Sequence, residues 1–343
     1  MRIRRKHVTT TLVVLLGSLL IGCSHPAPSP SSTSSASHPS SPLPAVPTVA
    51  PTAVQLERSA IACMRSQDMP CAEAAWTSYI QLRPTDAKAI ANLGFALNKE
   101  GNDQAAIVQF RKAIDLGQGT YDLFGIYADS LGKVGRVDDA IDWSYKTLKL
   151  VPSLVDIRGQ LAKLLVLKKR YYEALTLLAE FDEYLDSRGQ RPYFSGERIA
   201  IESALQNSGQ ARATDAASLR LVKLGDQFYA PVNVGDSNTQ AFVVDTGASE
   251  VVLNDNFLVA SKARYTIARI HSSARTADGR LVDAKLVVID HMLVGPFELD
   301  NVNAMVCGTC SLLLGENALS KFDLNTSQVQ GVDILTLTAH HHT

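Results

Sequence analysis

The sequence has no excess of either charge and no apolar run long enough to span a bilayer as a mature helix. Its 343 residues include 33 basic and 34 acidic ones, so no basic patch marks it as a nucleic-acid-binding protein. The N-terminal apolar run, residues 8–22, is shorter than the about 20 residues that a membrane-spanning helix needs. Nucleic acid is therefore not an expected partner. The 46% of hydrophobic residues suffice for two modest cores.

Cysteine is also scarce, and one of the five cysteines ends the N-terminal apolar run. A basic stretch, MRIRRKH, precedes the run, and Leu20-Ile21-Gly22-Cys23 closes it. This order resembles a bacterial lipoprotein signal peptide over residues 1–22. The resemblance implies that Cys23 takes up a lipid and anchors the chain to a membrane of the cell envelope, on the periplasmic face. Ser24 is not acidic, which favours the outer membrane. An ordinary secretory signal or an uncleaved anchor is the alternative.

The other four cysteines fall into two close pairs, Cys63 with Cys71 and Cys307 with Cys310. An oxidising compartment and an even number favour two disulfides. The sequence CGTC also has the spacing of a redox motif, but that chemistry needs a helix N-terminus, and a leucine run typical of a strand follows here. Two free thiols are the alternative to the second disulfide. A zinc site is disfavoured because the first pair lacks metal-ligand spacing, so no metal is expected.

Residues 23–54 are rich in proline and serine, as in SHPAPSPSSTSSASHPSSP. Such a segment cannot bury a core, and we expect an extended, disordered tether.

A repeat of 34 residues follows over residues 55–212. Small residues recur at this spacing in two series, and large apolar residues follow the first series four positions later, with Ser144 as the exception. This pattern resembles the tetratricopeptide repeat, a helix hairpin whose helices cross closely at the small residues. We expect four units over residues 55–186 and a closing helix near Ser195 to Asn207. The two series are Ala72, Ala106, Ala140, Ala174 and Ala60, Gly94, Ala128, Ala162.

The period changes to two in the remainder, residues 213–343. Runs such as SLRLVKL, QFYAPVNV and QAFVV alternate or are wholly apolar, and turn signals separate them. Longer strand-like runs follow in RLVDAKLVVIDHMLV and NVNAMV. This part of the chain predicts a compact all-β domain.

One loop of the β domain carries a motif, Asp245-Thr246-Gly247-Ala248-Ser249, between the apolar runs FVV and VVL. The segment SLLLGENAL follows about 65 residues later, and a turn signal, Asp278-Gly279, lies between the two. The three marks in this order resemble retropepsin-like aspartic peptidases of the bacterial Asp-Thr-Gly-Ala type. The resemblance implies a catalytic Asp245 and a flap around Thr276, Ala277, Asp278 and Gly279. It further implies that Leu313, Leu314 and Gly315 thread behind the catalytic loop.

This chemistry needs two carboxylates that share one proton, one to activate water and one to protonate the leaving nitrogen. The chain has no second Asp-Thr-Gly. In the resembled family an identical subunit supplies the second carboxylate, so we expect a homodimer. The resemblance also implies that Thr246 locks its hydroxyl into the neighbouring loop. Ala248 in place of a hydroxyl residue favours activity nearer neutral pH. The C-terminal run QVQGVDILTLT has strand character and is a candidate for an intersubunit sheet.

The sequence thus predicts a multidomain α + β protein, an α-solenoid of tetratricopeptide-type helix hairpins followed by an all-β retropepsin-like (half-pepsin) barrel domain. The predicted function is aspartic endopeptidase activity on a peptide or unfolded protein, without a cofactor, with a protein partner on the repeats. The alternative is a non-catalytic scaffold lipoprotein that binds peptides or proteins, because a fold alone does not establish turnover.

Overall fold

The computed structural model describes residues 50–209, 218–275, 279–308 and 310–340. The predicted signal peptide, Cys23 and most of the predicted tether lie outside these residues. Pro51 to Thr343 form one compact unit. Within the described residues, none of the helices combines the length and the apolar character needed to cross a bilayer.

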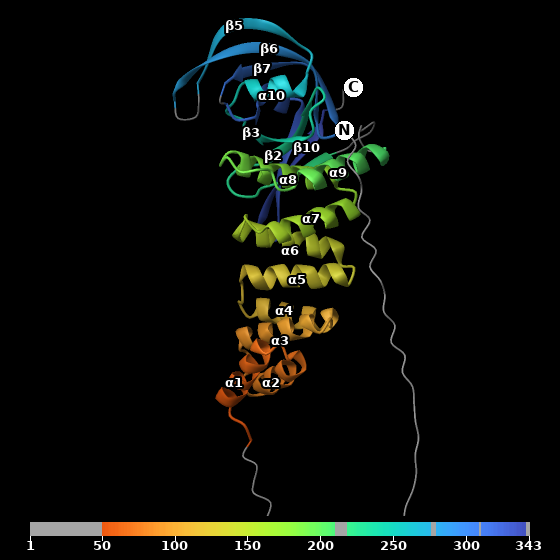
Figure 1. The fold of residues 1–343 in the computed structure, drawn as a ribbon, viewed down its shortest axis with the longest axis vertical. Coiled ribbons are helices and arrows are strands. Elements are labelled where there is room, and N and C mark those ends of the chain that lie inside the picture. Colours follow the sequence, from red (N-terminus) through yellow and green to blue (C-terminus); the bar gives the residue numbers. More distant parts are fainter. Residues whose placement is uncertain (1–49, 210–217, 276–278, 309, 341–343) are drawn as a thin grey trace, which may run out of the picture. The chain divides into compact units, whose positions relative to one another are not determined.

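The first half of this unit is a stack of paired helices (Figure 1). The first helices of the pairs begin at residues 53, 87, 121 and 155, and the second helices begin at 69, 103, 137 and 171. Both series keep the 34-residue period that the sequence predicts. The described helices are α1 (Ala53–Arg65), α2 (Met69–Leu82), α3 (Ala87–Lys99), α4 (Asp103–Asp115), α5 (Tyr121–Lys133), α6 (Val137–Leu150), α7 (Val155–Leu167), α8 (Tyr171–Asp186) and the predicted closing helix α9 (Ser195–Asn207).

The small residues of the repeat lie where two helices cross. Ala72, Ala106, Ala140 and Ala174 are fully buried, and the large residues four positions later pack beside them. At Gly94 of α3 a Cβ atom would lie 2.6 Å from the ring of Phe110 on α4. A larger side chain would therefore force the two helices apart, which explains why the repeat keeps a small residue here.

The turn inside each helix pair uses a left-handed residue at the same place in every unit. Gly101 and Gly135 adopt φ of 80° and 81° in the two central units, and Gln67 and Lys169 adopt 58° and 57° in the outer ones. Glycine takes this conformation without strain, whereas other residues do not. The outer units are thus the less ideal copies, as expected of the ends of a repeat array.

The sequence predicted that the solenoid begins at residue 55, and the first helix begins two residues earlier. Helix α1 starts at Ala53, because Thr52 forms a capping box with Gln55. The Thr52 hydroxyl accepts from the Gln55 N–H at 3.4 Å, and the Gln55 side chain accepts from the Thr52 N–H at 2.8 Å. Such a reciprocal cap fixes the first turn of a helix.

The second half is a β barrel. A seven-stranded sheet runs in the order β2-β3-β8-β4-β7-β6-β5, and an additional pairing of β2 with β6 closes six of its strands on themselves. Strand β5 remains outside the closure and pairs with β6. The described strands are β2 (Tyr229–Val234), β3 (Gln240–Val244), β4 (Val251–Asn254), β5 (Tyr265–Arg275), β6 (Leu281–Val294), β7 (Phe297–Cys307) and β8 (Leu313–Leu314); the short helices are α10 (Asp255–Ser261) and α11 (Glu316–Leu319).

A second, three-stranded sheet has the order β1-β10-β9, with β1 (Ser218–Val222), β9 (Phe322–Val329) and β10 (Val332–Ala339). The predicted C-terminal strand is therefore a hairpin paired within its own chain. Because β10 has a partner on both edges, a sheet between subunits would have to form at an outer edge of this sheet, on β1 or β9. Six consecutive residues of β9, Asp323 to Gln328, are exposed.

The helix stack and the barrel share a core. Leu224 and Val332 of the β part belong to the same buried cluster as residues of α6, α7, α8 and α9. Polar contacts reinforce it: the guanidinium of Arg198 on α9 donates to the backbone oxygen of Thr239, and the Thr239 N–H donates to Glu202 at 2.7 Å. The last helices of the stack are therefore part of the support of the barrel.

Candidate active site

Asp245 is the first residue beyond β3, where a parallel ladder with β8 continues past the end of the strand. The Asp245 N–H donates to the oxygen of Leu314 at 3.1 Å, as the Val243 N–H does to Leu312 at 3.0 Å. The chain then turns: the Gly247 N–H donates to Asp245 Oδ1 at 2.9 Å, and the Ala248 N–H donates to the Asp245 backbone oxygen at 3.2 Å. Asp245 is half-buried, and Thr246, Gly247 and Ser249 are exposed.

Strand β8 threads between β3 and β4 directly behind this loop. Leu313 pairs with Val243 on one side and with Val252 on the other, and Leu314 pairs with Val244. At Gly315 a Cβ atom would lie 2.2 Å from the backbone oxygen of Glu250 and 2.8 Å from that of Ala248. A side chain cannot fit there, because its neighbours are backbone atoms. The Glu316 N–H closes the crossing with a 2.7 Å hydrogen bond to Ala248 O.

Asn317, which the sequence motifs did not single out, holds the far end of the Asp245 loop in place. Its side-chain amide donates to Glu250 Oε2 at 2.7 Å and to the backbone oxygen of Asn303 at 2.8 Å, and its Oδ1 accepts from the Val251 N–H at 3.0 Å. Its own N–H donates to the oxygen of Ser249 at 3.2 Å. Asn317 therefore ties the far end of the catalytic loop to α11 and β7. The available signal was an amide side chain two residues after Gly315.

Glu250 follows the loop and was also missed. Burial raises the pKa of its carboxyl above the usual value. The carboxylate accepts from Asn317, so it is committed to holding the loop.

Thr246 lies at the tip of the loop, and its expected contact with a neighbouring loop stays a prediction. Its hydroxyl makes no hydrogen bond to any residue that the structure describes, and the side chain is exposed. The crossing segment supports the loop from behind only.

The predicted flap belongs to the hairpin of β5 and β6, which arches beside β7 in Figure 1. Thr276, Ala277 and Asp278 lie outside the described residues. Gly279 is described and adopts φ of 84°, and its oxygen accepts from Arg275 at 3.5 Å. Strand β5 is exposed over nearly its whole length, including Ile267 and Ile270, which are 54% and 67% exposed.

The four described cysteines are paired as two disulfides. Cys63–Cys71 joins α1 to α2, and Cys307–Cys310 links the end of β7 to the segment that leads into β8. The second bond lies just ahead of the strand that supports the catalytic loop. Among the described residues, no group of three or more histidine, cysteine or acidic side chains is placed to hold a metal ion.

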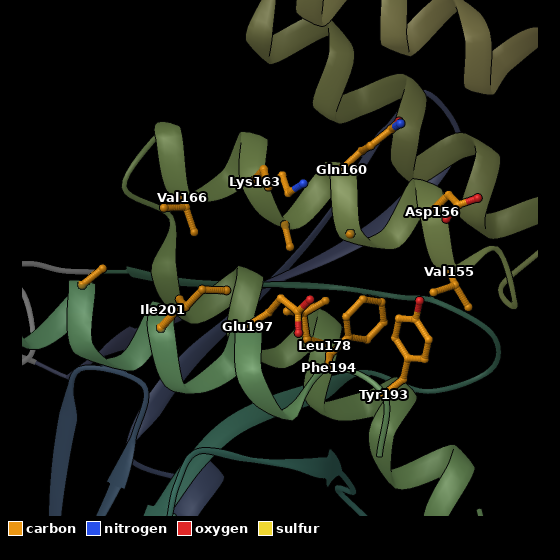
Figure 2. A pocket seen from close by; sticks show the side chains of 14 residues that line it. Val155, Asp156, Gln160, Lys163, Val166, Leu178, Tyr193, Phe194, Glu197 and Ile201 are labelled. Atoms are coloured by element: carbon orange, nitrogen blue, oxygen red, sulfur yellow. The ribbon is translucent and has the colours of Figure 1, made fainter. Parts of the chain in front are cut away.

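A pocket of about 680 Å³ lies within the helix stack, between α7, α8 and α9. Figure 2 shows the rings of Phe194 and Tyr193 and the carboxylate of Glu197 on one wall, with Lys163 and Gln160 on the opposite wall. Val155, Asp156 and Gln160 also line a second hollow of about 620 Å³ that continues over α5 and α3. The two hollows form one groove, apolar at the α9 end.

Comparisons with known proteins give separate matches for the β part and for the helical part of the chain. Residues 230–321 match the family described as "gag-polyprotein putative aspartyl protease". A retropepsin-like aspartic protease from Rickettsia conorii is 25% identical, with 37% of this chain and 96% of that chain covered and a TM-score of 0.27. A search of curated proteins gave no match.

The helical part is similar to solved tetratricopeptide proteins. YrrB, whose structure is described as a TPR protein with an unusual peptide-binding site, is 19% identical, with 46% of this chain and 78% of that chain covered and a TM-score of 0.41. MamA is 14% identical, with 46% and 92% covered and a TM-score of 0.35. The chain thus combines paired-helix repeats of 34 residues with a β domain that matches the aspartyl protease family over residues 230–321, a region that contains Asp245.

Proposed function

We propose that this chain is an aspartic endopeptidase whose active form is a homodimer, with water activated between the Asp245 carboxylates of two copies. The observation that carries the proposal is the placement of Asp245. It ends a strand inside the region that matches the protease family, on a loop held from behind by the β8 crossing. A rigid, partly open carboxylate is what general acid–base catalysis needs.

The surroundings of that carboxylate support the dimer. The nearby Glu250 is engaged by Asn317 at 2.7 Å, so it does not supply the second catalytic acid. Thr246, Gly247 and Ser249 are exposed around Asp245. A second copy would bring another Asp245 and offer a partner to the Thr246 hydroxyl. Two carboxylates in contact share one proton and titrate as a pair.

The substrate would be a peptide segment in extended conformation. Strand β5 presents an exposed edge, and a segment that lies between the β5–β6 hairpin and the Asp245 loop can form backbone hydrogen bonds as an added strand. The hairpin would cover the reacting bond and exclude water other than the attacking molecule.

The groove of the helix stack would recruit substrate or a protein partner. It combines an apolar floor at Phe194 and Ile201 with polar side chains at its rim, a surface suited to a peptide. The lipobox of residues 20–23 supports a lipid anchor on Cys23, at the periplasmic face of the outer membrane.

The test compares the full chain with its Asp245→Asn variant. Cleavage of reduced, carboxymethylated casein is followed at pH 4 to 8, and sedimentation gives the association state of both proteins. We expect the variant to lose at least about a hundredfold in rate while it keeps its fold and its association. Equal cleavage by both proteins, or activity in a strictly monomeric protein, would refute the mechanism.

The groove supports a second candidate function, that of a non-catalytic scaffold which binds proteins or peptides. This function does not need Asp245. If the wild-type chain binds casein yet leaves it intact at every pH and concentration tested, and Asp245→Asn binds equally well, the scaffold is the better account.

A further inference from the structure

A further pocket, of about 530 Å³ and separate from the groove of the helix stack, lies between α8 and the strands that carry the Asp245 loop. Tyr229 and Val243 of the barrel form one part of its lining, with Ser311 from the segment before β8. Helix α8 supplies Glu180, Phe181, Glu183 and Tyr184 to the lining, Ser187 follows from the end of this helix, and Arg158 reaches it from α7.

The pocket is on the same face of the sheet as the catalytic carboxylate. The N–H groups of Val243 and Asp245 donate successively to Leu312 and Leu314, so strand geometry continues to Asp245. Side chains two residues apart on a strand point to the same face, about 7 Å apart. The side chain of Val243, which lines the pocket, is therefore the neighbour of Asp245 on that face. An extended peptide has the same spacing between its own alternate side chains.

The carboxylates in the pocket outnumber its cations, two to one. Arg158 is buried, forms an ion pair with Glu180 at 3.5 Å and donates to the oxygens of Leu177 and Pro152 at 2.6 and 3.0 Å. Its Nε has no hydrogen-bond partner among the described residues. After this pairing one carboxylate is left, because no described residue donates a hydrogen bond to, or forms an ion pair with, the side chain of Glu183.

Glu183 is only partly accessible, and its neighbours do not neutralise it. Burial, with contributions from Glu180 and Asp186, raises its pKa to about 7, against the opposing effect of Arg198 on α9. Arg198 is itself engaged by Asp182 at 3.3 Å and by the oxygen of Thr239. A half-buried carboxylate without a counter-charge, in a cavity of this size, is suited to bind a cation supplied from outside.

We propose that this pocket is a substrate-specificity site that receives a lysine or arginine side chain lying within about two positions of the scissile bond, with Glu183 as its counter-ion. The helical-repeat part thereby supplies a residue of the substrate cleft of the barrel. The aromatic rings of Tyr184 and Phe181 would pack on the aliphatic stem. This assignment rests on the proposed function only in placing the pocket beside a bond that is cleaved. Binding of the basic side chain does not require cleavage.

The experiment uses immobilised full chain carrying Asp245→Asn and a random octapeptide pool, with bound peptides sequenced by mass spectrometry. We expect lysine and arginine to be enriched at least fivefold at one position. Adding Glu183→Gln should abolish the enrichment. Adding Asp186→Asn should keep the enrichment. This substitution removes the same charge from α8, but Asp186 does not line the pocket.

The pH dependence sharpens the test. The groups that face Glu183 are Glu180 and Asp186 on α8, Arg198 on α9, Arg158 on α7 and Tyr229 on β2. With Asp245 replaced, enrichment of basic residues should be stronger at pH 8 than at pH 5.5, where Glu183 is protonated. Should Glu183→Gln fail to fold, Ser187→Lys places a cation at the pocket and should also remove the enrichment.

The outcomes separate the two proposals. Absence of basic enrichment, or equal enrichment with Glu183→Gln, overturns the specificity site. Cleavage of the same pool by the wild-type chain that depends on Asp245 but ignores basic residues overturns the site and keeps the peptidase. Enrichment that depends on Glu183 without any Asp245-dependent cleavage keeps the site and overturns the peptidase.

Discussion

The helix stack and the barrel both contain a glycine at a close crossing, but the neighbours of the two glycines differ. At Gly94 the missing Cβ would meet the ring of Phe110 at 2.6 Å, and at Gly315 it would meet a backbone oxygen at 2.2 Å. A ring can rotate or shift with its helix, whereas a backbone oxygen in a paired strand cannot move alone. The stack therefore has room to adjust, and the catalytic loop has little.

Gly315→Ala should have the largest effect of the changes that test this comparison. Relief of the clash requires β8 to separate from the loop of Asp245, and we expect a loss of at least about 3 kcal/mol in the free energy of unfolding of the barrel. Both tryptophans, Trp76 and Trp143, lie in the helices. Limited proteolysis of residues 218–340 should therefore report the loss more strongly than tryptophan fluorescence during urea unfolding does. An unchanged proteolysis pattern would show that the crossing can relax.

Asn317→Ala should come next, at about 2 kcal/mol. The change leaves the Val251 N–H without its acceptor and Glu250 without its amide donor, and unmade hydrogen bonds of buried groups cost about 1–3 kcal/mol. Peptidase activity should fall more than stability does, because the loop loses its fixed position. Asn317→Asp is the matched control, since it keeps the acceptor for Val251 and loses the donor. Wild-type kcat in Asn317→Ala would refute a positioning role.

Gly94→Ala should cost less, about 1 kcal/mol. The clash with Phe110 costs roughly 1–3 kcal/mol, but alanine regains about 1 kcal/mol of helix propensity. Urea unfolding followed by tryptophan fluorescence measures the net change. A loss as large as that for Gly315→Ala would remove the distinction between the two regions.

Glu183→Gln comes last, with an effect no larger than that of Gly94→Ala and of opposite sign: a gain of about 1 kcal/mol at pH 8 and little at pH 5. The folded-state pKa of about 7 exceeds the usual 4.5, so the folded chain binds the proton more tightly than the unfolded chain. Stability is therefore lost as pH rises from about 4.5 to 7. Thermal unfolding at the two pH values checks the sign. A gain of the same size at pH 5 would show that charge is not the cause.

The local patterns of the sequence predict much of the fold. The alanine series predicts the helix pairs at their observed period, and the apolar runs predict β1, β2, β3, β6 and β7. The glycine at position 315 and the acid at 245 are found because each stands in a short sequence motif. The pairing of β2 with β6 and the contact of α8 with β3 join segments about 60 residues apart, and no periodicity reports them.

The candidate site is predicted less completely for the same reason. Asp245 and the crossing segment carry a recognisable motif, but Asn317 acts through contacts with Glu250, Val251 and Asn303 that only the folded chain brings together. Glu183 lies in a helix of the repeat, where an acidic residue near the end is ordinarily a solvated one. Its role follows only from the strand packed against it.

Because β2 closes on β6, the backbone amides of the seven-stranded sheet fall into two groups. Six strands form a ring in which every strand has a neighbour on each side, whereas β5 has β6 alone. A ring offers no terminal strand from which pairing can be lost stepwise, so its amide hydrogens should exchange with deuterium together, in a single cooperative opening. Those of β5 should exchange long before, as a hairpin edge that opens while the rest of the barrel stays intact.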